Sequence, residues 1–129
     1  MIFDVLDNLE WYQKQYPSVA RLIDIMDRSL PYEDADGTYC VDGIEYAVSS
    51  YISHSDGPIE EASFDCMHIV LEGEEMIALE EEGIPSVVAL AIPGRFILLE
   101  KGEHYKPSLQ NGVPQQVKKV IFTLAGPRP

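Results

Sequence analysis

Two segments of the sequence each place a histidine beside other groups that bind metals or move protons. The first contains Asp65, Cys66 and His68, and the second contains His104 and Tyr105. Histidine titrates near neutrality, so it suits proton transfer or metal ligation at physiological pH. We therefore take these two segments as the candidate ligand site.

One interpretation is a divalent metal site. Cys66 and His68 are separated by one residue, so on a β-strand their side chains point to the same side. Together with His104 they would supply the three protein ligands of a catalytic zinc site with one open position. The alternative is structural: a buried cysteine beside a hydrogen-bonded histidine on an inner strand.

A second interpretation is acid–base catalysis on a sugar without a metal. Anomerisation or isomerisation moves protons between a ring oxygen and a hydroxyl, which requires both an acid and a base. The groups that could fill these roles are Asp65, His68, Glu103, His104 and Tyr105.

Three residues near the second histidine are candidates for binding the substrate. Arg95 or Lys106 would pair with the carboxylate of a sugar acid. Glu103 would contact the substrate beside His104. The simpler interpretation of Arg95 and Glu103 is that both are surface residues of turns.

The elements that must position these groups change in type along the chain. Residues 1–32 predict a helical cap, because apolar residues recur at helical spacing, as in Val19, Leu22 and Met26. Residues 37–124 predict a β-barrel that begins with a hairpin at Asp42-Gly43. Later strands are expected near 60–71, 75–79, 86–92, 95–100 and 116–124.

This order of elements predicts a mainly β single domain of 129 residues, a β-sandwich or jelly roll with N-terminal helices.

The composition limits the partners. The chain has 22 acidic and 9 basic residues and a net charge of −13, which opposes binding to nucleic acid and to anionic membranes. The cluster 80–82 is interpreted as a solvated turn. No signal peptide or membrane-spanning run is visible, and the two cysteines do not form a disulfide framework. We expect a cytoplasmic protein.

Several short motifs follow one another in a fixed order along nearly the whole chain. They include Gly37-Thr38-Tyr39-Cys40-Val41-Asp42-Gly43, Leu71-Glu72-Gly73-Glu74-Glu75, Pro93-Gly94-Arg95-Phe96, Gly102-Glu103-His104-Tyr105-Lys106-Pro107 and Val117-Lys118-Lys119-Val120. Their order and spacing resemble the YhcH/YjgK/YiaL family, which includes proteins similar to the β-galactosidase β-subunit.

The resemblance implies a cupin-like double-stranded β-helix that handles sugars or sugar acids, including sialic acid, as an anomerase or epimerase. It also implies a metal-compatible pocket. The sequence departs from the family pattern at this pocket: Asp65 stands for the family's glutamate, and Tyr105 occupies the position of its later histidine.

Two functions therefore stay open. The first is an isomerase acting on a small-molecule sugar or sugar acid, with a divalent metal such as zinc as one option for its cofactor. The second is a non-catalytic carbohydrate-binding, accessory or regulatory subunit that has lost the family's metal site. A homodimer is also considered, because apolar strands on a barrel surface support self-association.

Overall fold

The N-terminal region combines one short strand with helices. The computed structural model describes residues 1–53, 58–82, 84–109 and 114–124. Strand β1 (Ile2–Val5) is followed by a 3-10 helix, η1 (Leu6–Tyr12), and by the α-helices α1 (Val19–Asp27) and α2 (Leu30–Glu33). The carboxylate of Asp4 accepts hydrogen bonds from Asn8 and from the Tyr12 hydroxyl, which ties η1 to the end of β1.

Nine further strands follow in the described part of the chain. They are β2 (Gly37–Val41), β3 (Ile44–Ile52), β4 (Glu60–Glu61), β5 (Cys66–Glu72), β6 (Glu75–Glu81), β7 (Ile84–Ala91), β8 (Arg95–Leu99), β9 (His104–Leu109) and β10 (Gln116–Thr123). The hairpin expected at Asp42-Gly43 is present, with Val41 opposite Ile44. Both turn residues have positive φ angles of 52° and 81°, as a tight two-residue turn requires.

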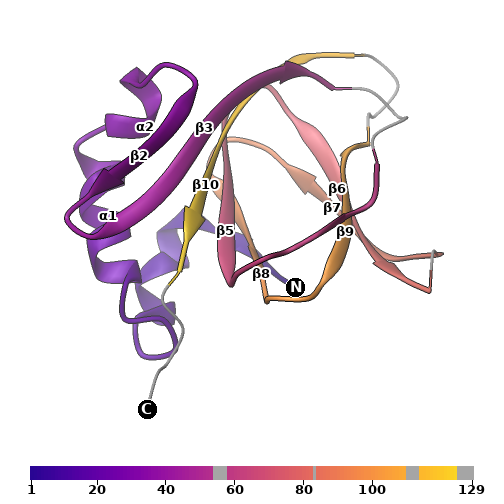
Figure 1. The fold of residues 1–129 in the computed structure, drawn as a ribbon, viewed down its shortest axis with the longest axis horizontal. Helices are drawn as coiled ribbons and strands as arrows, with labels where there is room; N and C mark the ends of the chain where they lie inside the picture. The colour runs from indigo at the N-terminus through magenta and orange to yellow at the C-terminus, as the bar shows by residue number, and fades with distance from the viewer. Residues whose placement is uncertain (54–57, 83, 110–113, 125–129) are drawn as a thin grey trace.

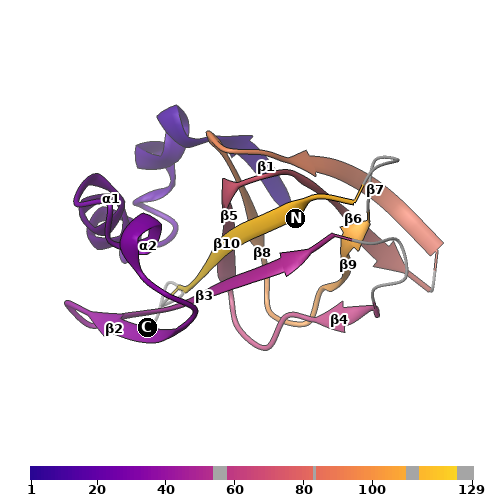
Figure 2. The ribbon, with the colours of Figure 1, turned by 90° about the horizontal axis from the view of Figure 1, so that it is seen from above.

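The strands form two antiparallel sheets that face each other. One has six strands in the order β1-β8-β5-β10-β3-β2, and the other has four in the order β4-β9-β6-β7. Figure 1 shows α1 and α2 on the side of the six-stranded sheet that faces away from the four-stranded sheet, and Figure 2 shows the same three layers from above. The expected mainly β fold with antiparallel sheets and N-terminal helices is therefore confirmed.

Strand alternation divides the apolar residues into two cores. On β5, Met67, Ile69 and Leu71 belong to the core under the helices. Cys66 and Val70 belong to the core between the two sheets. Successive residues of a strand point to opposite faces, so His68 also lies on the side between the sheets. The strand is buried on both faces, which explains its nearly continuous apolar sequence.

The structure differs from the expected elements in several places. The strand expected near 60–71 is two separate strands, β4 and β5, and β6 extends beyond the expected end at 79. Residues 2–5 form β1 because they pair with β8, with Ile2 opposite Leu98 and Val5 opposite Arg95. Residues 104–109 form β9, although Lys106-Pro107 interrupts any apolar alternation there. Both strands are defined by pairing with distant segments, which a local pattern does not reveal. Asn111-Gly112, a dipeptide that predicts a turn, lies outside the described residues.

In the described part of the chain, no helix has the length and apolar character needed to span a membrane.

The turn that brings β5 into β6 depends on Gly73. Its φ is +77°, and a Cβ atom placed there would lie 2.2 Å from the backbone oxygen of Gln116. Gly94 has a similar φ of +93° but nothing within 4 Å of such an atom. Both glycines therefore adopt a backbone conformation that favours glycine, but only at Gly73 does a neighbouring backbone atom leave no room for a Cβ atom.

We expect Gly73→Ala to destabilise the fold more than Gly94→Ala. Both variants should lose about 1–2 kcal/mol for an alanine at positive φ. Only Gly73→Ala must also move β10, which adds about 1–3 kcal/mol. Urea unfolding of both variants measures the difference, and equal losses would contradict this account of the turn.

Candidate functional site

A buried ion pair joins the two sheets. The Lys119 ammonium lies 2.9 Å from Oε1 of Glu75. The whole residues are only 4% and 1% exposed, respectively. The Tyr51 hydroxyl donates a hydrogen bond to Oε2 of the same carboxylate. The ammonium also lies 5.5 Å from the centre of the Tyr51 ring, within cation–π range. Strands β3, β6 and β10 thus each contribute one side chain to this network.

The turn at Gly73 and the alternation of β10 place these side chains inside. Glu75 is the first residue of β6, directly after the turn that Gly73 permits. Val117, Lys119 and Ile121 alternate along β10 and share the face toward the four-stranded sheet. Lys118 is on the opposite face and donates to the backbone oxygen of Tyr32 on the helix side. The pairing of β10 with β5 shifts at this point because β5 carries one extra residue, Leu71.

His68 lies in the same interior without a hydrogen-bond partner. It is 2% exposed, and no described group is positioned to hydrogen-bond to either ring nitrogen. Its ring packs edge-on against Tyr105, with ring centres 5.3 Å apart and planes at 84°. Burial, and secondarily the positive charge of Lys119, lower the pKa of His68 well below its usual value. The imidazole is therefore neutral at pH 7, with one donor and one acceptor available.

Two further interior groups keep their protons at neutral pH. Burial raises the pKa of the Cys66 thiol to about 11, against a smaller opposing effect of Lys119. Burial also raises the pKa of the Tyr105 phenol. The interior thus combines one carboxylate, one ammonium, a neutral imidazole, two phenols and a thiol. This set contains a base and several proton donors in a space that largely excludes water, where electrostatic interactions are strong.

The interior donor set does not fit a catalytic metal ion. Among the described residues, no group of three or more His, Cys, Asp or Glu side chains could hold a metal. Cys66 is a protonated thiol, and the carboxylate of Glu75 already binds Lys119 and Tyr51. The Lys119 ammonium would also repel a cation placed beside His68. We therefore derive no reaction step through a metal.

The structure brings together only some of the residues singled out in the sequence. Cys66, His68 and Tyr105 face the space between the sheets. His104 does not join them, because it lies on β9 beside Tyr105 and points to the other face. Its side chain is 55% exposed, and Nε2 lies 3.1 Å from Oε1 of Glu61.

The other sequence candidates have structural contacts away from the interior. Asp65 accepts a hydrogen bond of 2.8 Å from the backbone N–H of Lys101. Glu103 accepts from the N-terminal ammonium of Met1 and from the backbone N–H of Glu100. Each carboxylate therefore holds two segments together that are far apart in the sequence: Asp65 binds Lys101, and Glu103 binds Met1.

The two basic candidates also lie outside the interior. The Arg95 guanidinium lies 5.4 Å from the ring centre of Phe3 and donates to the backbone oxygen of Leu90. Lys106 is half-buried on β9, opposite Ala78. It is two residues from His104, so its side chain points to the same face of the strand as His104 and to the opposite face from Tyr105.

Sequence reasoning missed Tyr51, Glu75 and Lys119. The signal for Lys119 was its position on β10, between Val117 and Ile121 on one strand face. A lysine flanked at i−2 and i+2 by apolar residues is unusual for a solvated face, and the opposite face, with Val120 and Phe122, is also apolar. No local signal identified Glu75 as its partner, because the pairing connects two sheets.

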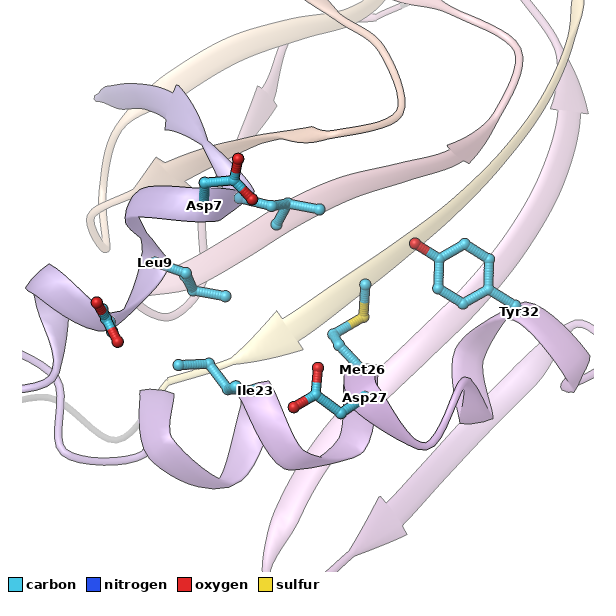
Figure 3. Close-up of a pocket in the computed structure, with 8 residues that line it drawn as sticks. Asp7, Leu9, Ile23, Met26, Asp27 and Tyr32 are labelled. Atoms are coloured by element: carbon cyan, nitrogen blue, oxygen red, sulfur yellow. The ribbon is translucent and has the colours of Figure 1, made fainter.

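A separate cleft of about 380 Å³ lies between η1, α1 and α2. Figure 3 shows Leu9, Ile23 and Met26 lining it, with the carboxylates of Asp7 and Asp27 beside them. It lies on the other side of the six-stranded sheet from His68 and Lys119. It combines apolar and acidic side chains but no acid–base pair, so we place the candidate site between the sheets.

Comparison with known proteins supports the fold. No protein-family model matches the sequence, and no curated protein matches it. The chain is similar to hydroxypropylphosphonic acid epoxidase from S. wedmorenis, solved with fosfomycin, with 17% identity and a TM-score of 0.54. That match covers 62% of this chain and 43% of the epoxidase, so it spans less than half of the epoxidase's length.

Two other solved structures match more of their own length. Protein NMB1881 from Neisseria meningitidis is 12% identical with a TM-score of 0.54, over 77% of this chain and 95% of that one. A protein of unknown function from Rhizobium leguminosarum is 21% identical with a TM-score of 0.54, over 77% and 90%.

These likenesses, together with the two facing sheets, define the chain as a cupin-like β protein. Two other solved structures that are similar to this chain are of a protein named HppE, one a Co(II) form and one an Fe(II) form, so the cupin-like fold is compatible with metal use.

We expect Lys119→Met to destabilise the protein by about 3–5 kcal/mol, because it removes the positive charge that compensates the buried Glu75 carboxylate. Adding Glu75→Gln should recover part of this loss, since the negative charge disappears while the amide oxygen still accepts from Tyr51. Urea unfolding of the single and double variants measures both effects.

Lys118→Met is the matched control. Its ammonium binds a carbonyl near the surface, so its loss should cost at most about 1 kcal/mol. Equal losses for the two lysines would show that the interior ion pair is not formed.

The pH dependence of stability tests His68. As the pH falls below 6.5, the unfolded state gains a proton on this residue while the native imidazole stays neutral. The stability contributed by neutral His68 is complete above pH 6.5 and decreases toward the lower native pKa. We expect wild type to lose up to about 1.4 kcal/mol per pH unit relative to His68→Phe in this window. Parallel pH profiles would contradict a buried neutral imidazole.

Proposed function

We propose that this protein binds a small sugar or sugar acid between the two sheets and interconverts its anomers or epimers without a metal. The observation that carries the proposal is the Glu75–Lys119 pair in the same enclosed interior as the unpartnered imidazole of His68. The ordered motifs similar to the YhcH/YjgK/YiaL family support the choice of substrate, and we infer a divergent relationship to that family, including its link to sialic acid.

The side chains present are sufficient for anomerisation. The Glu75 carboxylate would remove the proton from the anomeric hydroxyl, while the Tyr51 phenol or the Lys119 ammonium donates a proton to the ring oxygen. The bond between the anomeric carbon and the ring oxygen breaks, which gives an open-chain carbonyl. Ring closure on the other face reverses both proton transfers, so no oxidant, reductant or co-reactant is consumed.

His68 would orient the sugar rather than carry a charge. A neutral imidazole can accept from one hydroxyl and donate to another, and both ring nitrogens are without partners among the described residues. A bound sugar that supplies these hydrogen bonds would remove the cost of burying two unsatisfied nitrogens. The Lys119 ammonium would meet the carboxylate if the ligand is a sugar acid.

The alternative is a carbohydrate-binding module without catalysis. One observation favours it: Asp65, which stands for the family's glutamate, and His104, one residue before the position of the family's later histidine, contact Lys101 and Glu61 rather than the interior. Both functions require the barrel to open for a ligand to enter, because His68, Glu75 and Lys119 are each at most 4% exposed. A sugar that is bound but not converted would still supply hydrogen bonds to the ring nitrogens of His68.

Exchange NMR distinguishes the two functions. We expect substoichiometric protein to accelerate α/β exchange of N-acetylneuraminic acid or a common aldose above its rate in buffer. Glu75→Gln should abolish the acceleration, because an amide does not accept the proton. Lys118→Met should retain it.

Each outcome of this experiment has a defined meaning. Exchange at the buffer rate together with saturable ligand-induced shifts near His68 would support the binding module and reject the enzyme. Exchange at the buffer rate with no ligand-induced shifts would reject both. Circular dichroism of Glu75→Gln verifies that a loss of activity is not a loss of fold.

A further inference from the structure

We propose that a second site, on the outer face of the four-stranded sheet, binds a small organic ammonium ion, with the carboxylate of Glu80 as its anchor. This site is separate from the interior cluster and does not depend on the function proposed for it. We call it the Glu80 cleft; it is lined by Ile59, Leu79, Glu80, Glu81, Glu82, Gly102, Glu103 and His104.

The cleft consists of two cavities that share Glu80, Glu82 and His104. Their volumes are about 350 and 270 Å³. Glu80 and His104 are cross-strand neighbours on β6 and β9. Their neighbours in sequence, Leu79 and Tyr105, pack into the core between the sheets. By strand alternation, Glu80 and His104 therefore face outward into the cleft.

Glu80 is the unusual residue of this cleft. It is 7% exposed, and its Oε2 atom is buried without a hydrogen-bond partner among the described residues. The register between β6 and β7 shifts between Leu79 and Glu80, which is the position of a bulge. A buried carboxylate is normally paired or hydrogen-bonded, because desolvation of an isolated charge is costly. A carboxylate that lines a cavity can obtain a partner from a ligand.

The charges around Glu80 select a cation. Among the described residues, the lining includes neither lysine nor arginine, and its other acids are Glu81, Glu82 and Glu103. Glu103 is already neutralised by the N-terminal ammonium of Met1. His104 is paired with Glu61 outside the lining. The remaining acids therefore lack a described basic partner, and an anionic ligand would be repelled.

The geometry favours an organic ammonium over a metal ion. No three acidic, histidine or cysteine side chains in the described part of the chain converge closely enough to ligate a metal. An ammonium carries three donors, so it can satisfy Oε2 of Glu80 and bind a second acceptor. The apolar side chain of Ile59 offers a surface for its carbon chain.

Titration with 1,4-diaminobutane, followed by the backbone amide signals of β6 and β9, tests the proposal. At constant ionic strength we expect saturable shifts in wild type. Glu80→Gln should weaken binding by at least about tenfold, as expected when one partner of a buried charge pair is removed. Glu72→Gln is the matched control, because this exposed glutamate on β5 lies outside the cleft, and we expect it to bind like wild type.

Three outcomes would overturn the proposal. The first is the absence of saturable shifts, which would mean that water alone satisfies Glu80. The second is equal affinity of Glu80→Gln and wild type, which would indicate general attraction to an acidic surface. The third is displacement of the diamine by equimolar calcium or manganese, which would indicate a metal site. Unfolding measurements on Glu80→Gln without ligand verify that the variant is folded.

Discussion

The structure depends on one electrostatic constraint: the charges of Lys119 and Glu75 are both withdrawn from water between two sheets. Such a pair is costly to desolvate and is stable only when both partners stay in place. It therefore fixes how the six-stranded and four-stranded sheets face each other. Glu75 directly follows the turn that Gly73 permits, and Lys119 lies on the inward face of β10.

The two faces of the six-stranded sheet have different roles. Its helix-facing side contributes Met67, Ile69, Phe96, Leu98 and Phe122 to a continuous apolar core. Its other side holds the polar cluster around His68 and Lys119. Because the same strands serve both faces, the position of each interior side chain is set by rigid packing on the opposite side. This arrangement preorganises a site at low entropic cost, as catalytic and binding sites require.

Much of the fold could be predicted from local patterns, and part of the site could not. Period-two alternation and the Asp42-Gly43 turn predict the hairpin, and the spacing of Cys66 and His68 predicts that they share a face. Strands β1 and β9 were missed because non-local pairing creates them. Glu80 was expected in a solvated turn, but it is a buried residue of β6, since the strand extends beyond the expected end at 79. Glu75 and Lys119 were missed because a contact between sheets leaves no signature in either segment.

His68 links the fold to its proposed use, since its neutral, unpartnered imidazole is costly unless a ligand satisfies it. The most direct measurement is the ¹⁵N NMR spectrum of the His68 ring between pH 5 and 8, with and without a sugar acid. The account predicts a neutral imidazole throughout this range and a change in its ring nitrogen shifts when the sugar acid is added. An imidazole that titrates with the ordinary histidine pKa, or ring signals that no sugar acid changes, would contradict it.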